Sequence, residues 1–270
     1  MQRQLNLNDD AVYYSNEASN QYMSVSQFKG FLSCEARAVA KLKGEWTENI
    51  DSQALLIGNY VHSFFESEQA HESFVEKNKD KLFSKRKPFG LLKAYEQADA
   101  MIEKLKNEPL FNYLWQGERE TVVTGEFLGV EWKGKIDLLS VEKGYFIDLK
   151  TTADMNKRIY SEDYGGYVSF VEAYGYVLQI AVYEKLLEMK YGKPFVGYIY
   201  AISKHDYPQV SAIEIEQRKK DMELNWLHER MPHIIEVKNG NEPPINCGKC
   251  DYCKATQKLD GFITTEDLIG

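Results

Sequence analysis

Two carboxylates and a lysine lie within residues 134–152, on two short apolar segments that a tight turn at 142–144 separates. The segments are rich in Ile, Leu, Val, Tyr and Phe, which favours a hairpin of two strands in a largely buried sheet. Asp148 and Lys150 are two residues apart and share one face of their strand, and the pairing brings Asp137 to the same end. Two acids beside a lysine are costly in a core unless something offsets their charge. A divalent metal ion would do so, but the segment alone is equally compatible with a hairpin whose charges face water.

The chain is long and apolar enough to form one folded core. It has 270 residues, of which 43% are hydrophobic, and this suits a single domain. A net charge of −8 argues against nonspecific nucleic-acid binding over the whole surface, although it leaves room for a local basic channel. The N-terminus lacks a signal-peptide pattern and no apolar run is long enough to span a membrane, so we expect a soluble cytoplasmic protein without a membrane partner.

Local patterns along the chain predict an α/β fold class. We expect one domain with an N-terminal arm and helices over 1–50, a core over about 51–215, and a C-terminal helix and cysteine segment over 216–270. Residues 1 to about 22 are polar and predict an extended or mobile arm. The expected helices are 24–42, 51–69 with Asp51 as N-cap, 91–106, 169–191 and 216–238; the expected strands are 121–128, 130–139, 145–151, 195–202 and 210–215; a polar connection is expected over 77–88 and a loop over 164–167.

One predicted helix presents Gly58, His62 and Glu66 along a single face, because they are four residues apart. The glycine would let another backbone or a ligand come close, and His62 offers a neutral imidazole to a metal. The simpler interpretation of this motif, taken by itself, is a core helix with a histidine whose hydrogen bonds are satisfied.

A later helix carries Gln179 and Tyr183, which are one turn apart. Together they could present an amide and a phenol to the oxygens of a phosphodiester. An interior tyrosine that merely packs is the more common meaning of such a residue.

The four motifs fall in one order, and that order resembles the RecB-like branch of the PD-(D/E)XK nuclease superfamily over about residues 55–205. The motifs are G-x-x-x-H at 58–62, G-x-x-D at 134–137, D-x-K at 148–150 and Q-x-x-x-Y at 179–183. The segment Tyr22–Arg37 is similar more specifically to RecE-like exonucleases encoded by phages and prophages. The resemblance implies a restriction-endonuclease-like PD-(D/E)XK core, with a central mixed β-sheet flanked by helices.

This sequence departs from the superfamily pattern at two positions. The first motif has Ile136-Asp137 in place of Pro-Asp, and the last acid is Asp148 instead of Glu. Both departures are typical of the RecB-like branch, and Lys150 is intact.

The resemblance also implies a role for each motif residue. Mg²⁺ or Mn²⁺ would be held by His62, Asp137, Asp148 and the backbone carbonyl of Leu149. Lys150 would orient the nucleophile and stabilise the charge that develops in the transition state. Gln179 and Tyr183 would position the DNA strand, and Glu66 would hold a metal-bound water or support His62.

The four cysteines are Cys34, Cys247, Cys250 and Cys253. So few thiols fit a reducing compartment without a disulfide framework, and the number suits a [4Fe-4S] cluster or structural Zn²⁺. Four idle thiols are the alternative. Because one cysteine precedes the core and three follow it, the arrangement is similar to the iron–sulfur clasp of AddB-type nucleases, which favours [4Fe-4S] over Zn²⁺.

Residues that would contact DNA are harder to identify. One dense basic run could bind duplex backbone or a 5′-phosphate, although a solvated loop is the more frequent meaning of such a run. Three aromatic residues could stack on unpaired bases. The basic run is Lys85, Arg86 and Lys87; the aromatic candidates are Trp115, Tyr164 and Tyr167.

The resemblance implies a metal-dependent exonuclease that degrades linear double-stranded DNA from its ends in the cytosol of a bacterial host. The enzyme would run 5′ to 3′, leave a 3′ single strand for a single-strand annealing recombinase, and act as a homo-oligomer around DNA. One alternative is a CRISPR-adaptation-type Fe-S nuclease. Another is a non-catalytic DNA-end-binding module, which the intact set of Asp137, Asp148 and Lys150 disfavours because binding alone needs no such lysine.

Overall fold

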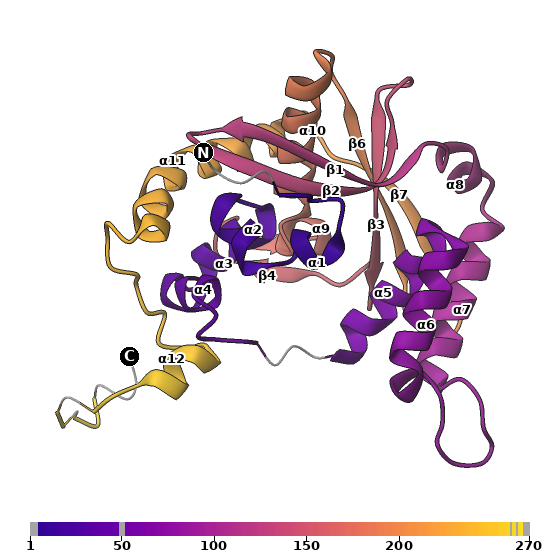
Figure 1. Cartoon of the computed structure of the whole chain (residues 1–270), viewed down its shortest axis with the longest axis horizontal. Helices are drawn as coiled ribbons and strands as arrows, with labels where there is room; N and C mark the ends of the chain where they lie inside the picture. The colour runs from indigo at the N-terminus through magenta and orange to yellow at the C-terminus, as the bar shows by residue number, and fades with distance from the viewer. Residues whose placement is uncertain (1–4, 49–51, 260, 263, 267–270) are drawn as a thin grey trace.

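The computed structural model describes residues 5–48, 52–259, 261–262 and 264–266 (Figure 1). The predicted N-cap Asp51 lies outside the described residues. None of the described helices is both long enough and apolar enough to cross a membrane.

A mixed five-stranded sheet forms the centre of the molecule, in the order β1-β2-β3-β6-β7. Strands β1 to β3 form an antiparallel meander, β6 lies parallel to β3, and β7 returns antiparallel to β6. A parallel neighbour needs a long crossover, and α10 (Tyr176–Tyr191) provides it. The strands of this sheet are β1 (Glu118–Phe127), β2 (Val130–Ser140), β3 (Tyr145–Thr152), β6 (Val196–Ser203) and β7 (Val210–Glu214).

Helices cover both faces of the sheet (Figure 1). The core on one face joins the sheet to α3, α10 and α11, and the core on the other joins it to α5, α7 and α8. This is the α/β class with a central mixed sheet flanked by helices, so the predicted fold class is confirmed. The helices are α1 (Asp10–Tyr13), α2 (Asn16–Gln21), α3 (Val25–Ser33), α4 (Glu35–Leu42), α5 (Ser52–Glu66), α6 (Glu68–Leu82), α7 (Lys93–Lys106), α8 (Pro109–Leu114), α9 (Phe170–Ala173), α10 (Tyr176–Tyr191), α11 (Gln217–Asn239) and α12 (Asp251–Thr256).

Two helices that we predicted as continuous are interrupted. The helix predicted over 24–42 breaks at Cys34, whose extended backbone (φ −168°, ψ 109°) turns its thiol towards the C-terminal segment. The helix predicted over 169–191 breaks at Gly175, which has a φ of +65°. A glycine suits that left-handed conformation, and a Cβ there would also stand 2.7 Å from Cδ of Lys29.

Two predicted irregular segments are partly regular. The polar connection predicted from residue 77 is helical as far as Leu82, because α6 continues until that buried side chain reaches the core. The predicted loop over 164–167 belongs to a small hairpin of β4 (Ile159–Ser161) and β5 (Gly166–Val168).

The prediction of an extended or mobile N-terminal arm was wrong for its described part. Residues 5–22 form α1 and α2 and pack against the sheet, because their few apolar side chains make a small core of their own around Leu7, Tyr13 and Ala18. Lys133 of β2 donates to the carbonyl of Tyr13 and ties the segment down. The segment therefore forms a wall beside the predicted site.

Candidate active site

The site lies where β2 and β3 separate. Their pairing runs from Ser140↔Tyr145 to Leu138↔Ile147, and Asp137 and Asp148 would form the next pair. Instead, Oδ2 of Asp137 accepts a hydrogen bond from the backbone N–H of Leu149 at 2.6 Å. The fork places the two carboxylates side by side at the end of a rigid hairpin, as the sequence predicted. A metal contact of the Leu149 carbonyl stays a prediction.

Asp148 is held by both of its oxygens. Nζ of Lys150 lies 2.6 Å from Oδ2, and Gln179 donates to Oδ1 at 2.8 Å. Only 2% of Asp148 is exposed, so these two partners fix its orientation in a poorly solvated place. Gln179, which we predicted to position the DNA strand, contacts the carboxylate in this structure.

The predicted face of α5 does point at the site. A Cβ on Gly58 would lie 3.4 Å from Oγ1 of Thr151, so the glycine allows the helix to lie close to β3. One turn later, Nδ1 of His62 lies 3.5 Å from Oδ1 of Asp137. Glu66 follows at the exposed end of the helix, where the charges of Lys135 and Asp137 act on it.

Tyr183 packs inside the protein instead of presenting its phenol freely. Its ring fills the space beside Gly134, where a Cβ would stand 2.5 Å from Cε1. This contact explains physically why the glycine of G-x-x-D and the tyrosine of Q-x-x-x-Y occur together, since any side chain at position 134 would push α10 away from β2. Burial raises the pKa of Tyr183 well above its ordinary value, so the phenol stays neutral.

A cleft of about 310 Å³ opens onto the two carboxylates. Its walls come from β2, β3, α3, α10 and the N-terminal segment, which contributes Tyr13 and Tyr14. Four lysines also line it, although the chain as a whole is acidic. They are Lys29, Lys133, Lys135 and Lys150. A local concentration of positive charge of this kind suits a polyanionic ligand.

The pKa values of Asp137 and Asp148 are shifted in opposite directions. Burial raises the pKa of Asp148, and the nearby charge of Asp137 adds to this although Lys150 opposes it. Burial also acts to raise the pKa of Asp137, but the charge of His62 and the hydrogen bond to it outweigh burial, so the pKa is lowered. Carboxylate oxygens and an imidazole are donors that suit Mg²⁺ and Mn²⁺, and a cation there would offset the repulsion between the two acids. The residues present therefore fit a divalent ion.

Sequence reasoning missed one acidic residue at the site. Glu120 of β1 lies near His62 and Asp137, and one donor atom from each of the three residues falls within 4.8 Å of the others. Burial raises the pKa of Glu120, and the charge of Asp137 raises it further. Only the register of β1 against β2 reveals this proximity, and no local motif marks the residue.

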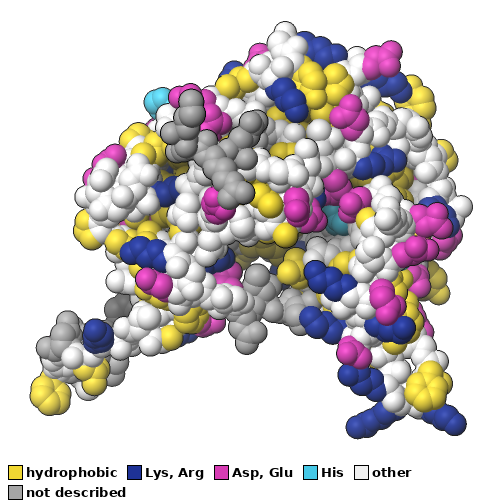
Figure 2. All heavy atoms as spheres, viewed as in Figure 1, with side chains coloured by type: hydrophobic (Ala, Val, Ile, Leu, Met, Phe, Trp, Pro, Cys, Tyr) yellow, Lys and Arg dark blue, Asp and Glu magenta, His cyan; other side chains and the backbone are white. Residues whose placement is uncertain are grey.

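The predicted DNA-binding residues Lys85, Arg86 and Lys87 lie apart from the cleft. They are exposed on the loop that joins α6 to α7, at the end of a helical pair that projects from the body (Figure 1). Figure 2 shows Lys and Arg side chains gathered at this tip.

The three aromatic candidates for stacking on bases differ in their surroundings. The prediction that Trp115 stacks on bases was wrong, because its ring is buried and stacks on Phe111 at a centroid distance of 4.7 Å. Tyr164 is partly buried and donates to Glu223. Tyr167 is exposed on β5.

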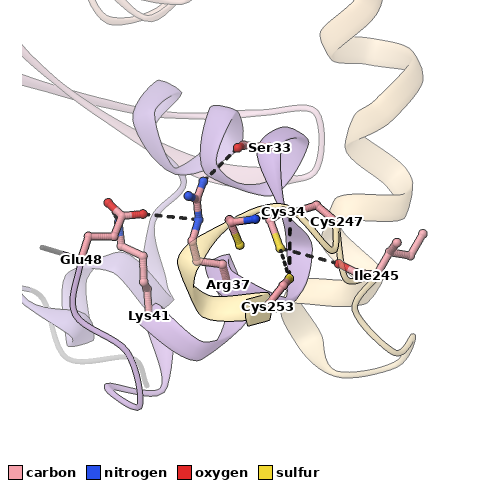
Figure 3. Close-up of polar contacts among 9 residues, drawn as sticks. Ser33, Cys34, Arg37, Lys41, Glu48, Ile245, Cys247 and Cys253 are labelled. Carbon is pink, nitrogen blue, oxygen red and sulfur yellow. Dashed lines mark hydrogen bonds and ion pairs between the residues drawn. The ribbon is translucent and has the colours of Figure 1, made fainter. Parts of the chain in front are cut away.

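The four cysteines converge, as predicted, although Cys34 lies far from the other three in the sequence. Sγ of Cys34 lies 3.5 Å from Sγ of Cys253, and Cys247 lies 3.9 Å from Cys253 (Figure 3). All four sulfurs, including that of Cys250, fall within 4.8 Å of one another. None of the four forms a disulfide. Backbone N–H groups of residues 249 and 250 donate to the sulfur of Cys247 and lower its pKa to about 6, which favours the thiolate that a metal requires.

Comparison with known proteins adds independent evidence on family. A family model described as a PDDEXK-like domain of unknown function (DUF3799) matches residues 24–256. The crystal structure of a candidate exonuclease from Eubacterium rectale is 31% identical, with a TM-score of 0.88, and the match covers 99% of this chain and 98% of that chain. The crystal structure of a protein named SSO0001 is 13% identical with a TM-score of 0.30, and the match covers 81% of this chain and 91% of that chain. No curated protein sequence matches this chain.

Proposed function

We propose, from the premise that this chain belongs to the PDDEXK-like family of unknown function (DUF3799), that it is a metal-dependent exonuclease acting on linear double-stranded DNA. The predicted membership of the PD-(D/E)XK superfamily is confirmed, and the fold is that of a nuclease. The substrate and the direction of digestion are our proposals.

One observation carries the proposal. Asp137, Asp148 and Lys150 meet at the fork between β2 and β3, inside a cleft that is lined by further lysines. A structural ion pair would need one acid and one lysine. Here a second, largely buried acid lies beside the first, and such an arrangement is costly unless a cation joins it.

The residues of the cleft would have different roles in phosphodiester hydrolysis. A divalent ion bound by the carboxylates would act as a Lewis acid on the scissile phosphate. Lys150, held by Asp148 at 2.6 Å, supplies a fixed positive charge where negative charge develops on the phosphate oxygens. Gln179 fixes the orientation of Asp148, and His62, which lies beside Asp137, would be a further ligand of the ion. Of the remaining lysines of the cleft, Lys29 and Lys135 would attract the phosphates of the substrate strand, whereas Lys133 is buried and donates to Tyr13.

The finer features of the proposal rest on resemblance. They are 5′ to 3′ digestion from a duplex end, a 3′ single strand passed to a single-strand annealing recombinase, and a homo-oligomer around DNA. The exonuclease name of the Eubacterium rectale protein supports action at ends. A CRISPR-adaptation-type nuclease and a non-catalytic DNA-end-binding module are the alternatives.

We propose further that the four cysteines hold a structural metal. Four sulfurs around one tetrahedral Zn²⁺, each at about 2.3 Å, stand about 3.8 Å apart, close to the 3.5 and 3.9 Å separations here. A [4Fe-4S] cluster binds its four cysteines at four different irons and needs a wider spacing. The geometry therefore favours Zn²⁺, whereas the order of the cysteines in the sequence favours the cluster.

Incubation of the protein with linear and covalently closed duplex DNA, with Mg²⁺ and with EDTA, tests the proposed activity. We expect degradation of linear duplex alone, and only with Mg²⁺. Cleavage of closed circles would indicate an endonuclease, and tight end binding without cleavage would indicate the binding module. Substrates labelled at the 5′ or the 3′ end determine the direction.

A further inference from the structure

A second cavity lies between α3, the β4–β5 hairpin, α9 and α11. Its volume of about 370 Å³ is within the range of small-ligand sites, and the proposed hydrolysis makes no use of it. We call it the side cavity. It shares Lys29 with the cleft that opens onto the two carboxylates. Its polar and aromatic lining includes Glu223, Tyr164, Trp226 and Arg230.

Lys29 connects the side cavity to the cleft. Its Nζ donates to the carbonyl of Tyr174 at 2.6 Å and lies 5.7 Å from the ring centroid of Tyr176. Nζ of Lys150 lies 4.7 Å from the same centroid, so both ammonium groups stand beside one ring. An ammonium has three donors, and the Tyr174 carbonyl takes one of those of Lys29. A DNA strand held near Lys150 can therefore also place a phosphate at Lys29.

Glu223 is a buried carboxylate whose hydrogen bonds are incomplete. It is 8% exposed, and its Oε1 accepts a hydrogen bond from the hydroxyl of Tyr164 at 2.6 Å. Among the residues that the structure describes, none donates to Oε2 and none forms an ion pair with Glu223. By contrast, Glu172 in the same lining pairs with Lys219 at 2.7 Å. Burial raises the pKa of Glu223, and a ligand that donates to Oε2 would stabilise its ionised form.

The wall beside Glu223 offers flat surfaces. The rings of Tyr164 and Trp226 meet edge to face at a centroid distance of 5.3 Å, and the guanidinium of Arg230 lies 5.6 Å from the centroid of Trp226. Trp226 and Arg230 are only partly buried. Unpaired bases stack on aromatic rings and on guanidinium planes, and a carboxylate accepts a hydrogen bond from the amino group of cytosine. The side cavity thus combines a stacking surface with a free acceptor.

We propose that the side cavity is a subsite for one unpaired nucleobase of the strand whose backbone lies in the cleft. The base stacks on Trp226, its amino group donates to Oε2 of Glu223, and Lys29 binds the phosphate between the two sites. Thymine has a carbonyl oxygen where cytosine has an amino group, so the subsite favours cytosine over thymine. The inference rests on the proposed function, because it identifies the substrate as a strand that is locally unpaired.

Fluorescence anisotropy of labelled oligodeoxycytidylate and oligothymidylate of equal length, with the full chain in EDTA, measures this preference without cleavage. We expect the cytosine oligomer to bind at least about 5-fold more tightly. Glu223→Gln keeps an acceptor for Tyr164 and replaces Oε2 by an amide donor, so the preference should vanish or reverse towards thymine. The matched control is Glu229→Gln, an exposed glutamate of the same helix, which should keep the preference.

A second variant, Trp226→Leu, removes the stacking surface and should weaken the binding of both oligomers at least about 5-fold. Thermal unfolding shows whether each variant is folded, and Trp226→Leu decides if Glu223→Gln does not fold. Equal affinity of the unaltered protein for the two oligomers would overturn the proposal. So would an unchanged preference in the folded Glu223 variant or unchanged binding by the folded Trp226 variant, and the hydrogen bond between Tyr164 and Glu223 would then be a purely structural contact.

Cleavage of linear duplex with Mg²⁺, measured on the same proteins, separates this inference from the proposed function. If the unaltered protein cleaves duplex and shows no preference between the oligomers, the inference fails and the proposed function stands. If the preference depends on Glu223 and no DNA is cleaved, the side cavity binds a base and the proposed function fails.

Discussion

The cleft and the cysteine site both gather side chains that bind metals, but they are built in opposite ways. The cleft takes carboxylates and an imidazole from adjacent strands and a helix, and it opens to solvent beside four lysines. The cysteine site takes four sulfurs from two segments separated by 219 residues at Cys34 and Cys253. It joins α4 to the C-terminal segment, and Cys34 and Cys253 themselves are buried.

This difference indicates which of the two sites could catalyse a reaction. A metal held by four protein ligands has no position for a substrate, whereas a metal held by fewer ligands keeps positions open. We therefore propose that the cleft is catalytic and that the cysteines stabilise the fold. Variants of each site should separate the two properties.

The largest effect is expected from Lys150→Ala. Removing the ammonium takes away the charge that stabilises the transition state, and the rate of cleavage of linear duplex should fall about 10²- to 10³-fold. DNA binding, measured by fluorescence anisotropy, should change by less than about 3-fold, since the other lysines of the cleft are retained. Lys157→Ala, an exposed lysine, is the control. A Lys150 variant that cleaves at the original rate would show that catalysis does not use the cleft.

The next effect concerns the cysteine site. Cys253→Ser should release the bound metal, measured by elemental analysis, and lower the Tm by about 5–10 °C, because a structural metal contributes to folding. Binding of Mn²⁺ in the cleft should persist. Ser33→Ala, next to Cys34, is the control. About one zinc per chain with no absorbance near ~400 nm would establish Zn²⁺, iron with that absorbance would establish the cluster, and an unchanged metal-free protein would leave four idle thiols.

A smaller effect should follow from removing the basic tip between α6 and α7. Replacing Lys85, Arg86 and Lys87 by Ala should weaken duplex binding and reduce the slope of log affinity against log salt by about 1 for each phosphate that these side chains neutralise. The cleavage rate at saturating DNA should be unchanged, because the tip lies apart from the cleft. Lys157 and Arg158, replaced together, form the control. An unaltered salt slope would mean that the tip is only a solvated loop.

The smallest effect is a pH dependence near the cysteine site. Hydrogen bonds to Glu35 and Glu242, both at 2.8 Å, raise the pKa of His233 above 6.5. A raised folded-state pKa gives stability that is fully present below pH 6.5 and is lost as the pH rises through the raised value. Because His233 is exposed, we expect its hydrogen bonds with the two glutamates to contribute less than about 1 kcal/mol to the free energy of unfolding.

Urea unfolding at pH 6 and pH 8.5 checks this. His233→Gln should lose the pH-dependent part of the free energy of unfolding, and His228→Gln, an exposed histidine of the same helix, should keep it. An identical pH dependence in both variants would contradict the account.

The sequence could predict those parts of the site that depend on short spacing. Asp148 and Lys150 share a strand face, and His62 lies one turn from Gly58, so both relations follow from period alone. Glu120 could not be found in this way, because its proximity to Asp137 depends on the pairing between β1 and β2. It also depends on a φ of +48° at Glu120, which residues with a side chain rarely adopt.

The same distinction explains the errors in the fold. The strands and most of the long helices follow hydrophobic pattern, and they appear where we expected them. The break at Cys34 does not follow from hydrophobic pattern. There the chain leaves the helical conformation where the sulfur of Cys34 contacts that of the distant Cys253, and no local pattern marks this contact. The N-terminal helices were not predicted, because their apolar side chains pack against Val122 of β1, and this contact cannot be read from the local sequence.

Treatment with EDTA, followed by elemental analysis and a cleavage assay before and after Mg²⁺ is added back, tests whether the cleft and the cysteine site have these separate roles. We expect EDTA to abolish cleavage of linear duplex while the cysteine site keeps its metal, and we expect Mg²⁺ alone to restore cleavage. Cleavage that persists in EDTA, or that returns only when the metal of the cysteine site is replaced, would contradict these separate roles.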